Sequence, residues 1–204
     1  MRLHTSKGAP NPRRVDIFLA EKGIVIERVL VDLNSQQHKA DDFRARNPIA
    51  RVPVLELDDG RCLPESRAIC GYIESLYPAP NLMGVDATER AFVEASDRQV
   101  EFSIFLTIAN AVRHAHPGLA TLEVPQFPDF GASQLGKLTG NARWLDERLA
   151  TQPYVAGERF TIADITAVCA IDFARLMKWK PADAGLAHIA AWRERVGQRP
   201  SLTA

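Results

Sequence analysis

The amino-acid sequence predicts a chain of two parts: an α/β domain in residues 1–77 and an all-helical domain in residues 87–204, joined by a linker in residues 78–86. Three observations support this division. Strand and helix patterns alternate through the first third of the chain. The proline-rich stretch Tyr77-Pro78-Ala79-Pro80-Asn81 then interrupts them. After it only helical periodicities occur, and 204 residues are enough for two small domains.

The first part has the element order β-α-β-α-β-β-α. Runs rich in β-branched residues predict strands, and apolar residues three or four positions apart predict helices. The strand–helix–strand half implies a right-handed parallel crossover, and Asp58-Asp59-Gly60 is typical of a hairpin turn in the other half. The expected strands are Arg2–Thr5, Ile24–Val31 (as a buried strand), Val52–Leu57 and Arg61–Leu63, and the expected helices are Pro12–Lys22, His38–Arg46 and Glu65–Leu76.

The second part contains only helical patterns. Thr161 and Asp164 form a capping-box pattern at the start of an apolar helix. The segment His116–Phe130 carries three prolines and is expected to be a loop. Apolar residues three or four positions apart between Leu135 and Leu149 predict one of these helices. The other expected helices are Ala87–Ala115, a segment from Thr161 to about Trp179, and Ile189–Val196.

Composition and charge exclude several classes of protein. Lys and Arg together number 25, and so do Asp and Glu, so the net charge of zero gives no general attraction to nucleic acid or to an anionic membrane. No apolar run approaches the length of a membrane span, and the N-terminal residues lack the apolar core of a signal peptide. We therefore expect a cytoplasmic protein that binds neither nucleic acid nor a membrane.

The cysteines and histidines predict no metal and no redox motif. The three cysteines, Cys62, Cys70 and Cys169, are odd in number and lack the spacing of a zinc site, which is typical of a reducing compartment. The five histidines also lack metal-ligand spacing. Each cysteine is flanked by apolar or small residues and is interpreted as a small buried side chain.

Three local features are candidates for chemistry, and the first is Ala9-Pro10-Asn11-Pro12-Arg13-Arg14. In this segment Asn11 fits a helix N-cap and Pro12 the first helical residue. A helix start directs free N–H groups and a positive partial charge at an anion, and the Asn11 side chain adds an amide donor. A thiolate there would be stabilised, so the pKa of the thiol would fall. The same residues also fit a well-formed helix start that binds no ligand.

The second feature is Pro53, which interrupts a strand pattern that resumes immediately. A cis Val52–Pro53 bond would turn the Val52 backbone outward, where its N–H and C=O groups could pair with an extended peptide ligand. A trans proline on an edge strand is the alternative, and it is the commoner arrangement.

The third feature is Glu65-Ser66 at a helix start. The Ser66 hydroxyl and the first backbone N–H groups offer donors to a carboxylate, and Glu65 offers an acceptor to an ammonium group. Together they suit the head group of an amino acid. Ordinary capping, with a favourable charge at the helix N-terminus, explains the same two residues without a ligand.

In combination these features resemble the cytosolic glutathione S-transferase family over essentially the whole chain. The resemblance rests on the β-α-β-α-β-β-α order, the linker and the helical second part. It also rests on four motifs: Asn47-Pro48, Arg51-Val52-Pro53-Val54-Leu55, Glu65-Ser66-Arg67-Ala68-Ile69 and Phe160-Thr161-Ile162-Ala163-Asp164. It implies a thioredoxin-like glutathione-binding domain followed by an all-helical domain that contributes the electrophile pocket.

The resemblance implies how most of the tripeptide is held. Val52, before a cis Pro53, would pair through its backbone with the cysteinyl residue. Glu65 and Ser66 would hold the amine and the carboxylate of the γ-glutamyl residue.

The resemblance also suggests contacts at the other end of the tripeptide. His38 and Lys39 lie where plant-type members bind the glycine carboxylate, and Arg51 lies close by. A solvated helix face fits His38 and Lys39 equally well. Asp97 resembles an acidic residue that reaches the partner subunit's glutathione in some classes.

The residue that contacts the thiol departs from the common pattern of the family. Ala9 stands where many members carry a serine, and no Tyr or Cys precedes Cys62. The Pro10-Asn11 pair resembles bacterial nu-type and yeast prion-like members, in which an asparagine faces the thiol. We assign Asn11 as the catalytic residue, with Ser6 as the alternative hydroxyl. A neutral amide cannot accept the proton, so Asn11 would act by stabilising the thiolate.

The electrophile pocket is expected between the domains, lined by the helical one. Aromatic side chains at helical spacing belong more often to a core than to a ligand site. The candidate residues of the pocket are Phe102, Phe105, His114, Phe173 and Trp179.

The sequence therefore predicts a glutathione transferase that binds glutathione as co-substrate, stabilises its thiolate and transfers it to an electrophilic substrate. Two alternatives stay open. Ala9 and Asn11 favour a glutathione-dependent disulfide oxidoreductase or peroxidase, and the fold also suits a non-catalytic interaction module. The resemblance further implies a homodimer with a role in detoxification.

Overall fold

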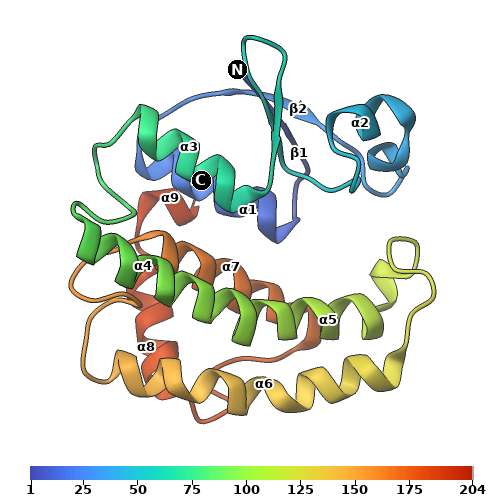
Figure 1. Ribbon diagram of the computed structural model, residues 1–204. Helices are drawn as coiled ribbons and strands as arrows, with labels where there is room; N and C mark the ends of the chain where they lie inside the picture. The colour runs from blue at the N-terminus through green and yellow to red at the C-terminus, as the bar shows by residue number, and fades with distance from the viewer. Residues whose placement is uncertain (204) are drawn as a thin grey trace. The chain divides into compact units, whose positions relative to one another are not determined.

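The computed structural model describes residues 1–203 and divides into two compact units, Met1–Pro80 and a second unit that begins at Asn81. The first unit is an α/β unit and the second is helical (Figure 1). This confirms the predicted fold class.

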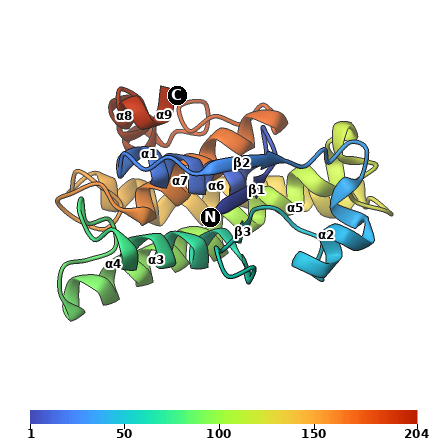
Figure 2. The same cartoon turned by 90° about the horizontal axis from the view of Figure 1, so that it is seen from above.

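The first unit is built on a four-stranded mixed sheet with the strand order β2-β1-β3-β4. β1 is parallel to β2 and antiparallel to β3, and β3 is antiparallel to β4. Figure 2 shows β2, β1 and β3 in this order across the sheet. The elements are β1 (Arg2–Thr5), α1 (Pro10–Glu21), β2 (Glu27–Leu30), α2 (Asp41–Arg46), β3 (Val54–Glu56), β4 (Cys62–Pro64) and α3 (Ser66–Leu76).

Successive side chains of a strand point to opposite faces of a sheet, and this sheet buries apolar side chains on both faces. Leu3 of β1 pairs in register with Leu55 of β3, and both side chains are fully buried. Phe18 of α1 and Ile69 of α3 are also fully buried. Val54, next to Leu55, belongs instead to a cluster of buried side chains with α2. α1 and α3 pack against each other, and their N-terminal ends lie close together.

Two elements of this unit differ from the prediction. The strand expected over Ile24–Val31 is shorter and is not buried: Val25 is 91% and Leu30 is 59% exposed. The reason is that β2 pairs only with β1 and forms an edge of the sheet. The helix expected over His38–Arg46 is interrupted at Ala40, which has extended backbone angles, so a short 3₁₀ turn at Gln37–Lys39 precedes α2.

Apart from an isolated β-bridge between Tyr154 and Gly157, the regular elements of the second unit are helices within the described residues. α4 and α5 run as one long rod, and α6 packs along it (Figure 1). α6 begins inside the segment that the sequence predicts as a loop, which also holds a 3₁₀ turn at Pro117–Leu119. The helices are α4 (Ala87–Gln99), α5 (Leu106–Ala115), α6 (Pro128–Leu149), α7 (Ile162–Ala174), α8 (Ala187–Val196) and α9 (Pro200–Thr203).

The rod of α4 and α5 contains a π-helical segment, Val100–Phe105, that joins the two helices. A π-turn displaces carbonyl groups from the regular helical ladder. The Ser103 carbonyl accepts from Thr107 Oγ1 at 2.9 Å and from Asn141 Nδ2 of α6 at 3.1 Å. The Trp144 indole N–H donates to Ser103 Oγ at 3.1 Å. Polar side chains of α6 therefore stabilise the irregular segment.

The predicted capping box at the start of α7 is present. Asp164 Oδ2 accepts from the Thr161 N–H at 3.0 Å, and Oδ1 accepts from the Val155 N–H at 3.0 Å and from the Trp192 indole at 3.1 Å. Burial of this carboxyl raises its pKa to about 6. α7 itself is buried along most of its length.

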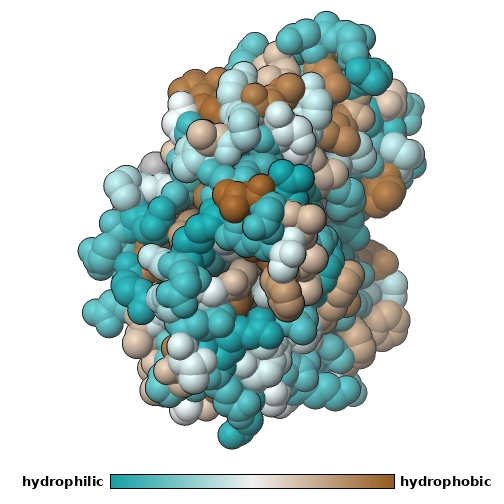
Figure 3. All heavy atoms as spheres, turned by 60° about the vertical axis from the view of Figure 1, so that its left-hand side comes forward, coloured by the Kyte–Doolittle hydropathy of each residue, from teal (hydrophilic) through white to brown (hydrophobic). Residues whose placement is uncertain are grey.

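Large apolar side chains such as Ile49 and Phe92 are exposed, each at 67%, and the face in Figure 3 carries scattered brown patches among polar atoms. Within residues 1–203, no helix has the length and apolar character needed to cross a membrane. The same residues contain no cluster of three or more His, Cys, Asp or Glu side chains placed to hold a metal ion.

Candidate functional site

The start of α1 differs from the prediction that Asn11 caps it and Pro12 opens it. α1 begins at Pro10, and Ala9 is the N-cap with extended backbone angles (φ −82°, ψ 135°). Both prolines are accommodated because the first N–H groups of a helix have no intrahelical partner, and a residue before proline favours extended angles. Asn11 therefore lies in the first turn, where its side chain is available to groups outside the helix.

The start of α3 combines a buried hydroxyl with an exposed carboxylate. α3 begins at Ser66, which is 3% exposed, whereas the preceding Glu65 is exposed. Glu65 has a φ of 70°, in the region that favours glycine, and this conformation costs a non-glycine residue on the order of 1–3 kcal/mol. The strained position separates the two side chains: the hydroxyl points inward and the carboxylate is accessible.

Arg14 joins the starts of α1 and α3. It is only 2% exposed, and its Nη1 donates to Ser66 Oγ at 2.8 Å and, more weakly, to Asn11 Oδ1 at 3.4 Å. The Ser66 hydroxyl also approaches Asn11 Oδ1, at 3.5 Å. Three polar side chains from two helices therefore meet at one place, and one of them carries a positive charge.

These contacts orient the Asn11 amide. Its carbonyl oxygen faces Ser66 and Arg14, so its NH₂ end is directed elsewhere and can still donate. The nearby guanidinium and the positive ends of two helices favour an anion in this region. A thiolate or a carboxylate would be stabilised there.

The loop before β3 leaves the backbone of Val52 available. The buried Asn47 organises this loop, because its Nδ2 donates to the Arg51 carbonyl at 2.8 Å and its Oδ1 accepts from the Ile49 N–H at 3.1 Å. The Val52–Pro53 bond is cis, the form that the resemblance implied. The N–H and C=O groups of Val52 have no hydrogen-bond partner in the described part of the chain.

His38, Lys39 and Arg51 form a cationic cluster in the first unit. His38 is 8% exposed, and its Nδ1 is buried with no hydrogen-bond partner among the described residues. Burial lowers the pKa of His38 below its usual 6.5, and the charges of Lys39 and Arg51 lower it further. Lys39 and Arg51 are exposed, and neither has an ion-pair partner within residues 1–203. The cluster suits an anionic group.

Ser6, the alternative partner of the thiol, follows β1 and is half-buried. No hydrogen bond in the described structure joins it to Asn11 or to Ser66. The structure therefore brings Asn11 and Ser66 together and leaves Ser6 outside their contacts.

Asp97 does not have the accessibility that the resemblance implied. It is fully buried in the helical unit, where it accepts from Thr166 Oγ1 at 2.5 Å and from Arg98 Nη2 at 2.9 Å. Because the carboxylate is enclosed within its own unit, the expectation that it reaches a partner subunit's ligand is wrong.

The aromatic candidates on α7 and in the π-helical segment have different environments. Phe105 is a core residue, 4% exposed, as the general preference of aromatic side chains suggests. Phe102 is 63% exposed, with the Arg98 guanidinium 5.8 Å from its ring centre. Phe173 on α7 is half-buried.

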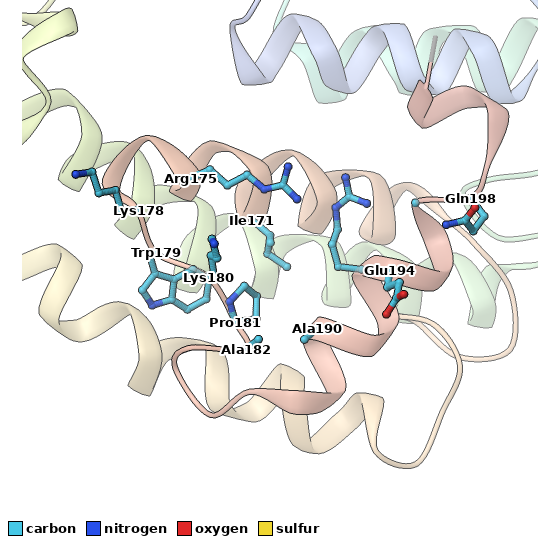
Figure 4. Close-up of a pocket in the computed structure, with 12 residues that line it drawn as sticks. Ile171, Arg175, Lys178, Trp179, Lys180, Pro181, Ala182, Ala190, Glu194 and Gln198 are labelled. Atoms are coloured by element: carbon cyan, nitrogen blue, oxygen red, sulfur yellow. The ribbon is translucent and has the colours of Figure 1, made fainter.

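His114 and Trp179 lie at separate places in the helical unit. The His114 ring packs against Phe127 and Phe130, and its Nδ1 accepts from the Phe127 N–H at 3.3 Å. Trp179 lines an open cavity of about 680 Å³ between α7 and α8 (Figure 4). None of the other four aromatic candidates is among the residues that line this cavity.

The sequence placed Arg14 in a candidate segment without a role, and it gave no role to the Asn47 side chain. A signal for Arg14 was present, because it stands four positions before Phe18 on the buried face of α1, where an arginine is unusual. Asn47 precedes a proline, a pair that favours the start of a turn, yet the sequence does not show that its side chain would bridge the loop.

The order of the elements and two matching family models identify the family of this chain. A β-α-β-α-β-β-α unit followed by a helical unit is the two-part arrangement that the sequence predicts. The model of the glutathione S-transferase N-terminal domain matches residues 3–81, and that of the glutathione S-transferase C-terminal domain matches residues 132–200. The chain therefore belongs to the glutathione S-transferase family.

Individual relatives agree with this family. Glutathione S-transferase 2 of Saccharomyces cerevisiae is 34% identical over 205 residues, which cover 99% of this chain and 88% of the yeast protein. GstA of Escherichia coli O157:H7, a glutathione S-transferase, is 31% identical over 91% of this chain and 88% of its own. The crystal structure of a glutathione S-transferase domain-containing protein from Marinobacter aquaeolei VT8 has a TM-score of 0.93 and 40% identity, covering 99% of this chain and 100% of that one.

Proposed function

We propose that this protein is a glutathione transferase in which the Asn11 amide stabilises the thiolate of bound glutathione. The observation that carries the proposal is the meeting of Asn11 and Ser66 through the buried Arg14. This contact joins the two helix starts to which the resemblance assigns the thiol and the γ-glutamyl group.

The γ-glutamyl end binds at α3 in this proposal. Ser66 Oγ and the first N–H groups of α3 donate to the carboxylate, and the exposed Glu65 carboxylate accepts from the ammonium group. Arg14 is a positioning residue, because it acts by fixing the Ser66 hydroxyl and the Asn11 amide. The charge of Glu65 is uncommitted, since it has no ion-pair partner within the described residues.

The rest of the tripeptide extends along the loop before β3. The free N–H and C=O groups of Val52, ahead of Pro53, pair with the cysteinyl backbone as a neighbouring strand would. His38, Lys39 and Arg51 receive the glycine carboxylate, which would satisfy the buried Nδ1 of His38 or neutralise the two exposed cations.

The chemistry then follows from charge stabilisation and positioning. The thiol loses its proton to solvent, because a neutral amide has no site to accept it. The Asn11 N–H group donates to the sulfur, and the helix N-termini and Arg14 add positive potential, so the pKa of the thiol falls. The thiolate attacks an electrophilic carbon of the second substrate, forming a C–S bond while the leaving group departs with the electron pair of its own bond.

The test is the kinetic comparison of Asn11→Ala with Ser6→Ala. We expect Asn11→Ala to raise the pKa in the pH profile of kcat/KM by about one unit or more, because loss of a hydrogen bond to a charged group costs about 1.5–3 kcal/mol. Glutathione affinity should be nearly unchanged. Asn34→Ala, an exposed asparagine outside the site, is the matched control. If Ser6→Ala shifts the profile and Asn11→Ala does not, the assignment of the thiol partner is wrong.

A second assay separates conjugation from disulfide or peroxide reduction. Turnover of a chloronitroaromatic substrate reports conjugation, and turnover of a hydroxyethyl disulfide reports reduction. Retention on glutathione resin separates both enzymes from a non-catalytic module. We expect retention and measurable conjugation.

We also propose that the protein is a cytoplasmic homodimer that acts in detoxification. The proposal rests on the family, whose members are typically dimeric with two-fold symmetric interfaces. Light scattering of the purified chain measures the mass directly, and a monomeric mass at working concentration contradicts the dimer.

A further inference from the structure

Few side chains attach α2 to the rest of the first unit. The helix is six residues long, and Phe43 is its one buried residue. Phe43 belongs to an apolar cluster with Val31 and Val54. In both cartoon views α2 stands apart from α1 and α3 (Figures 1 and 2). A helix with so little buried surface depends strongly on each contact that holds it.

A carboxylate of the sheet, Glu56 of β3, joins this helix to two residues of β1. Its Oε2 accepts from His4 Nε2 at 2.8 Å, and its Oε1 accepts from the Arg2 guanidinium. Arg46, the last residue of α2, has its Nε 3.9 Å from the same Oε2. The hydrogen bonds from His4 and Arg2 lower the pKa of Glu56 below its usual 4.5. Glu56 is therefore an ionised group shared by two strands and one helix.

His4 links this carboxylate to the apolar anchor of α2. The His4 ring is buried and meets the Phe43 ring edge-on, with the ring centres 6.4 Å apart and the planes at 75°. Because a carboxylate can only accept, its bond with His4 places a proton on Nε2 and fixes the orientation of the ring. Glu56 thus acts on α2 in two ways: through the His4 ring on Phe43, and directly on Arg46.

The start of α2 is continuous with the turn that carries His38 and Lys39. Ala40, between the turn and the helix, belongs to the hydrogen bonding of both. Its N–H donates to the Gln37 carbonyl at 3.1 Å, and its carbonyl accepts from the Arg44 N–H at 2.9 Å. The two side chains proposed for the glycine carboxylate therefore take their place from α2.

The end of α2 leads to the third member of the cationic cluster, Arg51. The Asn47 N–H donates to the Phe43 carbonyl at 3.0 Å, so Asn47 is tied to the buried residue of the helix. The Asn47 side chain in turn donates to the Arg51 carbonyl at 2.8 Å. Both ends of α2 thus reach the cluster, and the contacts that hold α2 on the sheet also place the three cationic side chains.

We propose that Glu56 and His4 are positioning residues that determine how strongly the protein prefers glutathione to γ-glutamylcysteine, the same peptide without its glycine. They act by holding α2 on the sheet, and thereby the cationic cluster at the glycine carboxylate. The inference rests on the proposed glutathione site. The contacts to the thiol and the γ-glutamyl group come from α1 and α3, so they do not depend on α2.

The test is titration calorimetry of glutathione and of γ-glutamylcysteine with the unmodified protein and with Glu56→Gln. The apparent affinity for a ligand falls with the fraction of molecules that hold the binding arrangement, so we expect Glu56→Gln to raise the Kd for glutathione roughly tenfold. The Kd for γ-glutamylcysteine should stay unchanged, because that peptide has no glycine carboxylate for the cluster to bind.

A second variant, His4→Phe, keeps an aromatic ring against Phe43 and removes the bond to Glu56. It should show the same selective loss of glutathione affinity, and the double variant should bind no more weakly than the weaker single variant, since both changes break one network. The matched control is Asp59→Asn, which removes an ion pair with Arg61 (Nη2 to Oδ2, 2.7 Å) between β3 and β4. It should leave both Kd values unchanged, and melting temperatures check that each variant is folded.

The two peptides separate failure of this inference from failure of the proposed function. Equal loss of affinity for both peptides in Glu56→Gln, or an unchanged affinity for glutathione, would overturn the positioning role. An unmodified protein that binds γ-glutamylcysteine as tightly as glutathione would also overturn it, because the cluster would then not hold the glycine carboxylate, while the thiol and γ-glutamyl contacts would stand. If the unmodified protein binds neither peptide, the proposed function itself is wrong.

Discussion

Replacement of Arg14 by methionine tests whether the buried guanidinium positions the site. Methionine has a similar length and no charge. The variant loses the 2.8 Å charge-assisted bond to Ser66 and the weaker contact to Asn11. Ser66 then loses the orientation for its own contact with the glutathione carboxylate. That contact, a hydrogen bond to a charged group, contributes about 1.5–3 kcal/mol, so its loss would raise the Kd for glutathione roughly tenfold to hundredfold.

The same substitution should have a smaller effect on folding. A buried charge that is replaced by an apolar side chain of similar volume often changes stability little, because the desolvation cost of the charge also disappears. We therefore expect the Kd from titration calorimetry to increase while the free energy of unfolding stays nearly constant. The pKa in the pH profile of kcat/KM should rise, since a positive charge near the thiolate is lost.

The control for this experiment is Arg28→Met, which removes an exposed arginine that pairs with Asp16 near the sheet edge. It should leave both the Kd and the pH profile unchanged. If Arg14→Met binds glutathione as tightly as the unmodified protein and keeps its pH profile, Arg14 is only a structural residue and the reasoning is refuted.

Three further predictions concern other groups. Ser66→Ala should weaken glutathione binding by roughly 1.5–3 kcal/mol in titration calorimetry, and an unchanged affinity would remove its role with the carboxylate. The pKa of His38, measured by NMR, should rise when glutathione binds, because an anion beside the ring favours its charged form; a lower or constant value contradicts the proposed glycine-carboxylate contact. The pKa of Asp164 is raised in the folded protein from its ordinary 3.8 to about 6, so the folded state retains the proton that the unfolded chain has already lost. The stability that this carboxyl contributes should therefore decrease as the pH rises from about 4 to about 6, by at most about 3 kcal/mol, and Asp164→Asn should remove that slope from denaturant titrations.

Local patterns were sufficient for most of the fold. The alternation of strand and helix patterns in residues 1–77 and the helical periodicity that follows predicted both units, because side-chain periodicity reports directly on which face of an element is buried. The Thr161–Asp164 capping box could be predicted from the sequence because its two residues are only three positions apart. Ile24–Val31 shows the limit: β-branched residues indicate a strand, but the position of that strand at the sheet edge depends on pairing that the sequence does not encode locally.

Local motifs named only part of the candidate site. Asn11, Val52 and Ser66 could be named from motifs, because each belongs to a short segment with its own backbone requirements. Arg14 could not be assigned a role, since its partner Ser66 is 52 positions away along the chain. The family resemblance also gave Asp97 an accessible role, whereas the structure buries its side chain.

The sequence by itself determined the order of the elements, the family and the residue types available near the thiol. Only the tertiary structure decided which of those residues meet. The packing of α1 against α3 places Arg14 on Ser66, and the pairing of β1 with β3 places His4 on Glu56. The physical reason is that local preferences act over a few residues, whereas contacts between distant segments are set by how apolar faces are buried together.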